Sequence, residues 1–250
     1  MTSPPPKKSD LPVRTLSAVV MLAVSGTALW LGGWWWTVFV AAVALGVLWE
    51  WWGLVREFAR TSLRQSIWLF GGLAYVGLAG IALVWLRDGE SDLLSVIVAV
   101  IATDVGAYFS GRTFGGPKIA PTISPSKTWA GLVGGSMGAA LGLAVVSWAW
   151  QHGLCERFYG PLPRFGFDGP CSGYIMPMGY TFLSCIINGA FIAIIAQTGD
   201  FFESWMKRRA GVKDSGNLIP GHGGLFDRVD GLLAVLFVLG LFMLVTRVLG

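Results

Sequence analysis

Long apolar runs without charged residues dominate the chain. Residues 15–49 contain no charged residue, and this run is too long for a single membrane-spanning helix of about 20 residues. Gly32 and Gly33 near its middle favour a turn, because glycine adopts backbone conformations that other residues avoid. The run therefore predicts two helices, at residues 15–31 and 34–55.

Five further apolar runs follow the first two along the chain. They lie at residues 66–86, 93–109, 128–151, 178–199 and 231–246. Their lengths approach or exceed what a helix needs to cross the hydrocarbon core of a bilayer. The pattern therefore predicts an all-α polytopic membrane protein with about seven transmembrane helices.

Composition and charge agree with a membrane protein. Charged residues make up 13% of the chain, against about 25% in soluble domains. If the N-terminus lies inside, fourteen Lys and Arg residues fall on its side of the membrane and four on the other. This bias identifies the N-terminal side as cytosolic. The net charge of +4 thus follows the topology, and we expect no nucleic-acid partner.

The three cysteines form no metal-binding spacing. Cys155 and Cys171 lie in the long loop predicted on the outer side, where a disulfide could form. Two unpaired thiols fit the sequence equally well, so both alternatives stay open.

Asp104 lies about twelve residues into the fourth apolar run. An ionisable side chain inside a membrane span is costly and is a functional candidate by default. A structural ion pair with Arg112, two helical turns further on, is the alternative.

A second polar cluster, "GGPKIAPTISPSKTW", occupies residues 115–129. Its three prolines exclude a helix. Ser124, Ser126 and Thr128 supply hydroxyl groups, and Lys127 supplies a positive charge, just before the next helix begins. A helix N-terminus with free N–H groups, hydroxyls and a lysine suits a phosphate. A capping serine beside an interfacial lysine would give the same pattern.

The densest polar segment joins the sixth apolar run to the seventh. Asp200, Glu203 and Lys207 are three and four residues apart and share one helical face. A loop rich in glycine follows, and Asp227 and Asp230 then open the last helix. Carboxylates bind Mg²⁺ through oxygen, whereas Lys and Arg neutralise phosphates. The alternative, a solvated charged loop, does not account for the glycines around its histidine.

This segment resembles the signature of the phosphatidate cytidylyltransferases, also called CDP-diacylglycerol synthases. Residues 204–230 read "SWMKRRAGVKDSGNLIPGHGGLFDRVD" and match its Ser, Lys-Arg, Lys-Asp, His-Gly-Gly and Asp-Arg-apolar-Asp positions. The resemblance extends upstream through "GDFFES" and "ISPSKT" to "DVGAYFSGRTFG". It covers the C-terminal three-fifths of the chain, whereas residues 1–87 match only as generic membrane helices.

The resemblance implies an enzyme of phospholipid synthesis that transfers CMP from CTP to phosphatidic acid, forming CDP-diacylglycerol and pyrophosphate. It implies membrane lipids as surroundings, the bacterial inner membrane as location with the site on the cytosolic face, and one or two Mg²⁺ ions. The implied catalytic residues are Asp104, Lys127, Asp200, Lys207 and Asp227, and the implied metal ligands are Asp200, Asp227 and Asp230. The implied substrate contacts are Ser124, Thr128, Arg208, Lys213, His222, Gly223, Gly224 and Arg228.

Two departures from the family pattern leave the acceptor open. The family usually shows Ser-Pro-Lys-Lys-Thr-x-Glu-Gly, but Ser126 and Ala130 replace a lysine and the glutamate here. A paralogue that acts on another lipid phosphate is therefore one alternative. A transporter is another, although transport predicts polar residues at mid-bilayer in several spans, and here they gather at one face.

The resulting organisation has three parts. Residues 1–14 are expected to form a disordered cytosolic N-terminus, residues 15–87 the N-terminal transmembrane helices, and residues 88–250 the catalytic transmembrane region with its cytosolic loop at 200–230. Glycines in the 128–151 run predict close helix packing and leave a homodimer open.

Overall fold

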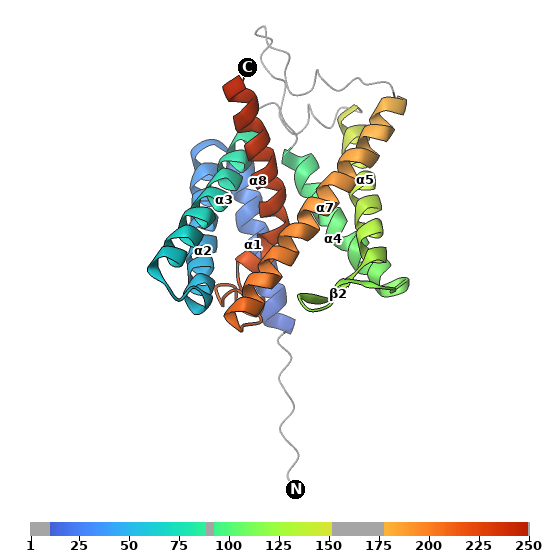
Figure 1. The fold of residues 1–250 in the computed structure, drawn as a ribbon. Coiled ribbons are helices and arrows are strands. Elements are labelled where there is room, and N and C mark those ends of the chain that lie inside the picture. The colour runs from blue at the N-terminus through green and yellow to red at the C-terminus, as the bar shows by residue number, and fades with distance from the viewer. Residues whose placement is uncertain (1–10, 89–92, 152–177, 250) are drawn as a thin grey trace.

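The computed structural model describes residues 11–88, 93–151 and 178–249. Figure 1 shows seven long helices and one small β-hairpin in this part of the chain. The elements are α1 (Leu11–Leu31), α2 (Gly33–Phe58), α3 (Ser62–Asp88), α4 (Leu93–Thr113), β1 (Lys118–Ala120), β2 (Ser124–Thr128), α5 (Trp129–Gln151), α7 (Met178–Ala210) and α8 (Phe226–Leu249).

All seven helices are long and apolar enough to cross a membrane, which confirms the predicted class and the predicted number of spans. Gly32 and Gly33 have φ angles of 64° and 48° and form the predicted turn between α1 and α2. The helix α1 begins at Leu11, so residues 11–14 are helical and not disordered as predicted. Residues 1–10, and Cys155 and Cys171 with their predicted alternatives, lie outside the described residues.

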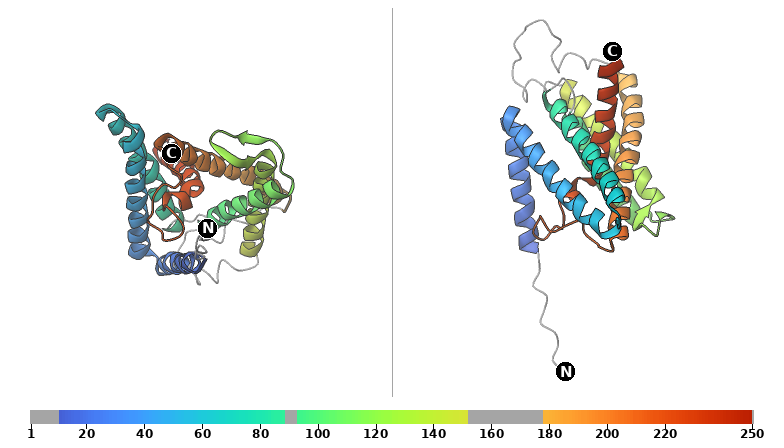
Figure 2. Two further views of the ribbon diagram at one scale, coloured as in Figure 1. Left: turned by 90° about the horizontal axis from the view of Figure 1, so that it is seen from below. Right: turned by 60° about the vertical axis from the view of Figure 1, so that its left-hand side comes forward.

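The helix α7 is the structural centre of the molecule. In Figure 1 it runs obliquely between α2, α3 and α8 on one side and α4 and α5 on the other. It contacts α2, α4, α5 and α8. Figure 2 shows that α1 stands at the edge of the bundle beside α2. Polar residues on different sides of α7 therefore face different partner helices.

The helix α7 continues eleven residues beyond the predicted end at residue 199. Charged side chains three and four residues apart are compatible with a helix, which the apolar pattern alone does not register. Gly211, with a φ angle of 72°, ends the helix. The N–H of Val212 bonds to the carbonyl of Lys207 at 3.0 Å across this end. Asp200, Glu203 and Lys207 consequently lie on one continuous helix, as their spacing predicts.

The proline-rich segment forms an antiparallel hairpin, which confirms that it is not helical. Lys118 pairs with Thr128 and Ala120 with Ser124. Proline is tolerated in strands mainly at an edge, and a two-stranded ribbon consists only of edges. The hairpin leads directly into α5, so it fixes the residues just before that helix.

The helices α4 and α5 pack closely through glycines, as predicted. A Cβ atom on Gly138 would collide with the carbonyl oxygen of Ala102 in α4. A Cβ atom on Gly106 would likewise collide with the carbonyl of Gly134. Small residues let helix backbones approach in a membrane, where lipid offers no hydrophobic driving force.

Replacing Gly138 by Ala is therefore expected to lower the stability of the bundle by about 1–3 kcal/mol, the usual cost of overpacking. The Gly77→Ala variant is the matched control, because a Cβ atom there meets nothing within 4 Å. Melting temperatures in detergent should fall for Gly138→Ala and stay level or rise slightly for Gly77→Ala. Equal melting temperatures would contradict the close packing of α4 on α5.

Candidate active site

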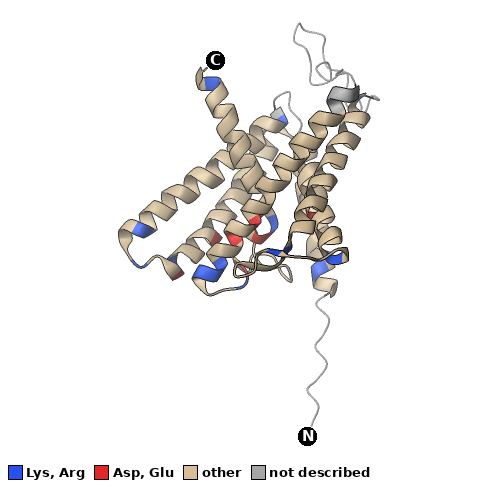
Figure 3. Cartoon of the chain, turned by 45° about the vertical axis from the view of Figure 1, so that its right-hand side comes forward, with Lys and Arg blue, Asp and Glu red and all other residues tan. Residues whose placement is uncertain are grey.

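A polar cavity of about 950 Å³ opens where α4, the hairpin, α5, α7 and α8 converge. Figure 3 shows that charged residues gather at this end of the bundle, where α1 begins and α7 ends. Thirteen charged residues line the cavity: Asp104, Arg112, Lys118, Lys127, Asp200, Glu203, Lys207, Arg208, Lys213, Asp214, Asp227, Arg228 and Asp230. The three predicted polar clusters thus meet in one place.

One side of the cavity is organised around Lys127 of the hairpin. Its ammonium group forms an ion pair with Asp200 of α7. Asp104 of α4 lies near enough to interact electrostatically with both residues. Asp230 of α8 interacts electrostatically with Asp200, Asp104 and Lys127. Three carboxylates from three helices therefore line the same cavity as Lys127, whose single charge offsets only part of theirs.

Asp104 does not form the alternative ion pair with Arg112. The guanidinium group of Arg112 instead donates a 2.8 Å hydrogen bond to the hydroxyl of Tyr108, one turn earlier on α4. Asp104 lines the same cavity as Lys127, Asp200 and Asp230.

The other side is organised around Lys207. Its Nζ atom lies 2.6 Å from Oδ1 of Asp227 and 2.5 Å from Oε2 of Glu203. The first contact is a hydrogen bond, whereas the second is an ion pair without hydrogen-bond geometry. Glu203 is only 1% exposed. Lys207 is therefore the cation that neutralises a buried carboxylate.

The two carboxylate oxygens of Asp227 have different partners. Its Oδ2 atom accepts hydrogen bonds from the N–H of Ser215 at 2.9 Å, from the hydroxyl of Ser215 at 3.0 Å and from the N–H of Gly224 at 2.9 Å. Its Oδ1 atom faces Lys207. The carboxylate is thus held by loop donors through Oδ2 and paired with Lys207 through Oδ1.

Four of the predicted substrate contacts do not line the cavity: Ser124, His222, Gly223 and Gly224. Ser124 is buried in the hairpin. The Nδ1 atom of His222 lies 3.0 Å from the hydroxyl of Ser17 in α1. Gly223, with a φ angle of 82°, accepts a hydrogen bond from Ile219 through its carbonyl. In this structure these residues shape the hairpin and the loop.

Thr128 and Arg228 line the cavity but also have structural partners. The hydroxyl of Thr128 accepts the N–H of Gly131 at 3.0 Å and caps the start of α5. The guanidinium group of Arg228 donates to the carbonyl of His222 at 2.6 Å. Lys213 and Arg208 line the cavity as predicted.

Several residues of the site were not predicted from the sequence. Gln197 lines the cavity, and its Nε2 atom has no hydrogen-bond partner in the described part of the chain. Glu203 lines the cavity too; its place on the helical face of Asp200 and Lys207 was predicted, but no role was assigned to it. Ser215, in the loop between α7 and α8, donates its hydroxyl to Glu50 of α2, and neither residue lines the cavity. Glu50 could have been noticed, because it is the first charged residue after the long apolar run and lies within a membrane helix.

The two departures from the family pattern occupy different environments. Ser126, in place of a lysine, lines the cavity. Ala130, in place of the glutamate, is not among the lining residues. The cavity therefore has one positive charge fewer than the pattern predicts.

The carboxylates do not form a ready-made metal site. Among the described residues, no three His, Cys, Asp or Glu side chains converge as metal ligands would. Asp200 and Asp227 are each paired with a lysine instead. Their oxygens are nevertheless the kind of donor that Mg²⁺ prefers.

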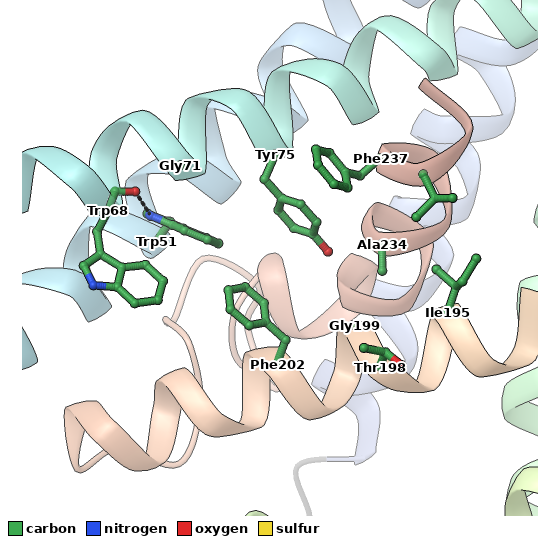
Figure 4. Close-up of a pocket in the computed structure, with 11 residues that line it drawn as sticks. Trp51, Trp68, Gly71, Tyr75, Ile195, Thr198, Gly199, Phe202, Ala234 and Phe237 are labelled. Carbon is green, nitrogen blue, oxygen red and sulfur yellow. Dashed lines mark hydrogen bonds between the residues drawn. The ribbon is translucent and has the colours of Figure 1, made fainter. Parts of the chain in front are cut away.

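A second, apolar pocket of about 510 Å³ lies on the other side of the α7–α8 crossing. Figure 4 shows Trp51, Tyr75 and Phe202 around it, with the hydroxyl of Tyr75 pointing inward. It is separate from the polar cavity, because α7 and α8 touch at Gly199, where a Cβ atom would lie 2.5 Å from the carbonyl oxygen of Asp230. No charged residue is among the described residues that line this second pocket.

Comparison with known proteins gives consistent matches. A model described as the cytidylyltransferase family matches residues 59–246. A protein named phosphatidate cytidylyltransferase from Brucella suis is 33% identical, over 94% of this chain and 93% of the relative. Proteins of the same name from Rickettsia bellii and Haemophilus influenzae are 31% and 35% identical, over 95% and 74% of this chain and 94% and 62% of the relative. The similarity therefore includes the N-terminal helices. The expectation that it covers only the C-terminal three-fifths is wrong.

Proposed function

Because the chain belongs to the cytidylyltransferase family, we propose that it transfers CMP from CTP to phosphatidic acid, forming CDP-diacylglycerol and pyrophosphate. The observation that supports this most strongly is the polar cavity, which combines lysines and aspartates from α4, the hairpin, α7 and α8. It lies at one end of the membrane-spanning bundle, where a lipid phosphate and a water-soluble nucleotide can meet.

In the reaction, a phosphate oxygen of phosphatidic acid attacks the α-phosphorus of CTP. The bond from that phosphorus to the oxygen bridging the β-phosphate breaks, and pyrophosphate leaves with the electron pair. The attacking phosphate is already an anion at neutral pH, so a strong general base is not required. The main barrier is the repulsion between two polyanions, which preorganised positive groups reduce.

Lys127 and Lys207 are the central cations of this proposal. Each is held by carboxylates, Lys127 by Asp200 and Lys207 by Glu203 and Asp227. An incoming phosphate competes with the carboxylates for each lysine. The lysines then move toward the phosphates, and Asp200 and the Oδ1 atom of Asp227 become free. Arg208, Lys213 and Arg228 supply further positive charge around the same space.

The freed carboxylates would hold Mg²⁺. Asp200, Asp227 and Asp230 are the proposed ligands, because oxygen ligands suit this ion and all three line the cavity. When bound, the metal supplies positive charge that stabilises the phosphates in the transition state. Lys127 and Lys207 line the same cavity and would bind the triphosphate.

We also propose that the cavity opens to the cytosol from the bacterial inner membrane. The excess of Lys and Arg on the N-terminal side supports this orientation. A cysteine introduced at the exposed Arg60 in an otherwise cysteine-free chain provides the test. It should react with a membrane-impermeant maleimide in inside-out vesicles and not in intact cells. Labelling only in intact cells would reverse the assignment.

The proposed reaction is tested with the purified chain in detergent micelles, CTP and a panel of acceptors. The panel contains phosphatidic acid, lysophosphatidic acid and a polyprenyl phosphate, each with Mg²⁺ or with EDTA. We expect CDP-diacylglycerol from phosphatidic acid and no product with EDTA. Product from the polyprenyl phosphate alone would identify a paralogue with another acceptor, consistent with the charge missing at Ser126.

A further inference from the structure

Glu50 is a buried carboxylate in the membrane-spanning helix α2, and it is only 3% exposed. It contacts a loop more than 160 residues away. Its Oε1 atom accepts the N–H of Leu225 at 2.9 Å, and its Oε2 atom accepts the N–H of Phe226 at 2.8 Å and the hydroxyl of Ser215 at 2.9 Å. A buried carboxylate is costly unless donors satisfy it, and here three donors do so.

Ser215 connects Glu50 to Asp227. Its hydroxyl oxygen lies 2.9 Å from Oε2 of Glu50 and 3.0 Å from Oδ2 of Asp227. The hydroxyl has a single proton, so its hydrogen bond is shared between the two carboxylates or donated to one of them at a time. The same oxygen accepts the N–H of Asp227 at 3.3 Å, and the N–H of Ser215 donates to Asp227. Asp227 is therefore oriented by a serine whose own position Glu50 fixes.

Two glycines of the loop make this arrangement sterically possible. A Cβ atom on Gly216 would collide with the carboxylate of Glu50. A Cβ atom on Gly224 would collide with the hydroxyl of Ser215 and also approach Glu50. Gly216 and Gly224 thus leave space for the carboxylate of Glu50.

We infer that Glu50 is a positioning residue for the active site, an inference that rests on the proposed function. It does not line the polar cavity, so it acts through Ser215 and through the first turn of α8. By holding both, it keeps Oδ2 of Asp227 engaged with the loop and leaves Oδ1 directed at Lys207 and at the cavity. The N-terminal helices therefore take part in organising the site.

The test uses Glu50→Gln, Ser215→Ala and the double variant in the full-length protein. Glu57→Gln is the matched control, because Glu57 lies on the same helix and is exposed. In Glu50→Gln an NH₂ group, which donates hydrogen bonds and cannot accept them, replaces one carboxylate oxygen. We expect kcat to fall about 10- to 100-fold, the scale of a displaced catalytic group. The KM for CTP should change less, because the cavity lysines remain.

Two further readouts separate positioning from general stability. The Glu50→Gln variant should speed amide hydrogen exchange in peptides covering residues 215–227, because the N–H of either Leu225 or Phe226 loses its acceptor. The double variant should lose little more kcat than Glu50→Gln alone, since both changes break the same connection. The control should match the wild type in exchange and in kcat.

Three results would overturn the inference: a kcat of Glu50→Gln within twofold of the wild type, losses in kcat that multiply fully in the double variant, or unchanged amide exchange at residues 215–227. If the wild-type chain transfers no CMP, the proposed function fails. In that case amide exchange alone decides whether Glu50 anchors the loop.

Discussion

The Asp227→Asn variant is expected to lose CMP transfer by about 100-fold or more, the scale of removing a preorganised charge from a transition-state site. The single oxygen of the new amide would stay with the three donors from Ser215 and Gly224. Its NH₂ group would then face Lys207, where Oδ1 now accepts a hydrogen bond. The cavity would lose a negative charge and an oxygen that can bind Mg²⁺.

The fold of Asp227→Asn should remain intact, because the loop donors keep an acceptor and Lys207 keeps Glu203. Initial rates of CMP transfer and melting temperatures in the same detergent provide the measurement. Glu57→Gln serves as the control for neutralising an acidic residue outside the site. Retention of more than a tenth of the wild-type rate would show that Asp227 is not essential for transfer.

The Lys207→Met variant should lose both activity and stability. Lys207 is the partner of Glu203, which is 1% exposed, and it also pairs with Asp227. Removing one partner of a buried ion pair costs about 3–5 kcal/mol, because an uncompensated charge stays behind. The melting temperature should fall clearly, and CMP transfer should become very slow.

A second variant separates the two effects. In Lys207→Met/Glu203→Gln the buried charge is removed along with its partner, so most of the lost melting temperature should return. Activity should not return, because the cation proposed to bind phosphate is still missing. If the double variant recovers activity together with stability, Lys207 has only a structural role.

The sequence predicts the membrane architecture well, because apolar length is a direct requirement of the bilayer. It also predicts the shared face of Asp200, Glu203 and Lys207, since helical spacing depends on local geometry. The main difference is the end of α7, where charged residues continue the helix to Ala210. The hairpin was predicted only as a segment that is not helical, since proline excludes a helix but does not specify strand pairing.

The contacts within the site depend on tertiary structure. The ion pair of Lys127 with Asp200 joins residues 73 positions apart and follows from how the hairpin sits beside α7. Glu50 is noticeable as an ionisable residue inside a predicted membrane helix, but its hydrogen-bond donors lie at positions 215–226, which no local pattern connects to it. His222 matches the family motif by position, but its Nδ1 atom faces Ser17. A motif identifies which residues matter and leaves their individual partners undetermined.

The most direct test of the central proposal follows the label from two preparations of CTP, one carrying ³²P at the α-phosphate and one at the γ-phosphate. Each is incubated with the purified chain, phosphatidic acid and Mg²⁺, and the lipid is then extracted. The account predicts that α-label appears in the lipid as CDP-diacylglycerol and that γ-label stays in the aqueous phase as pyrophosphate. Transfer of γ-label to lipid, or no labelled lipid from either preparation, would contradict it.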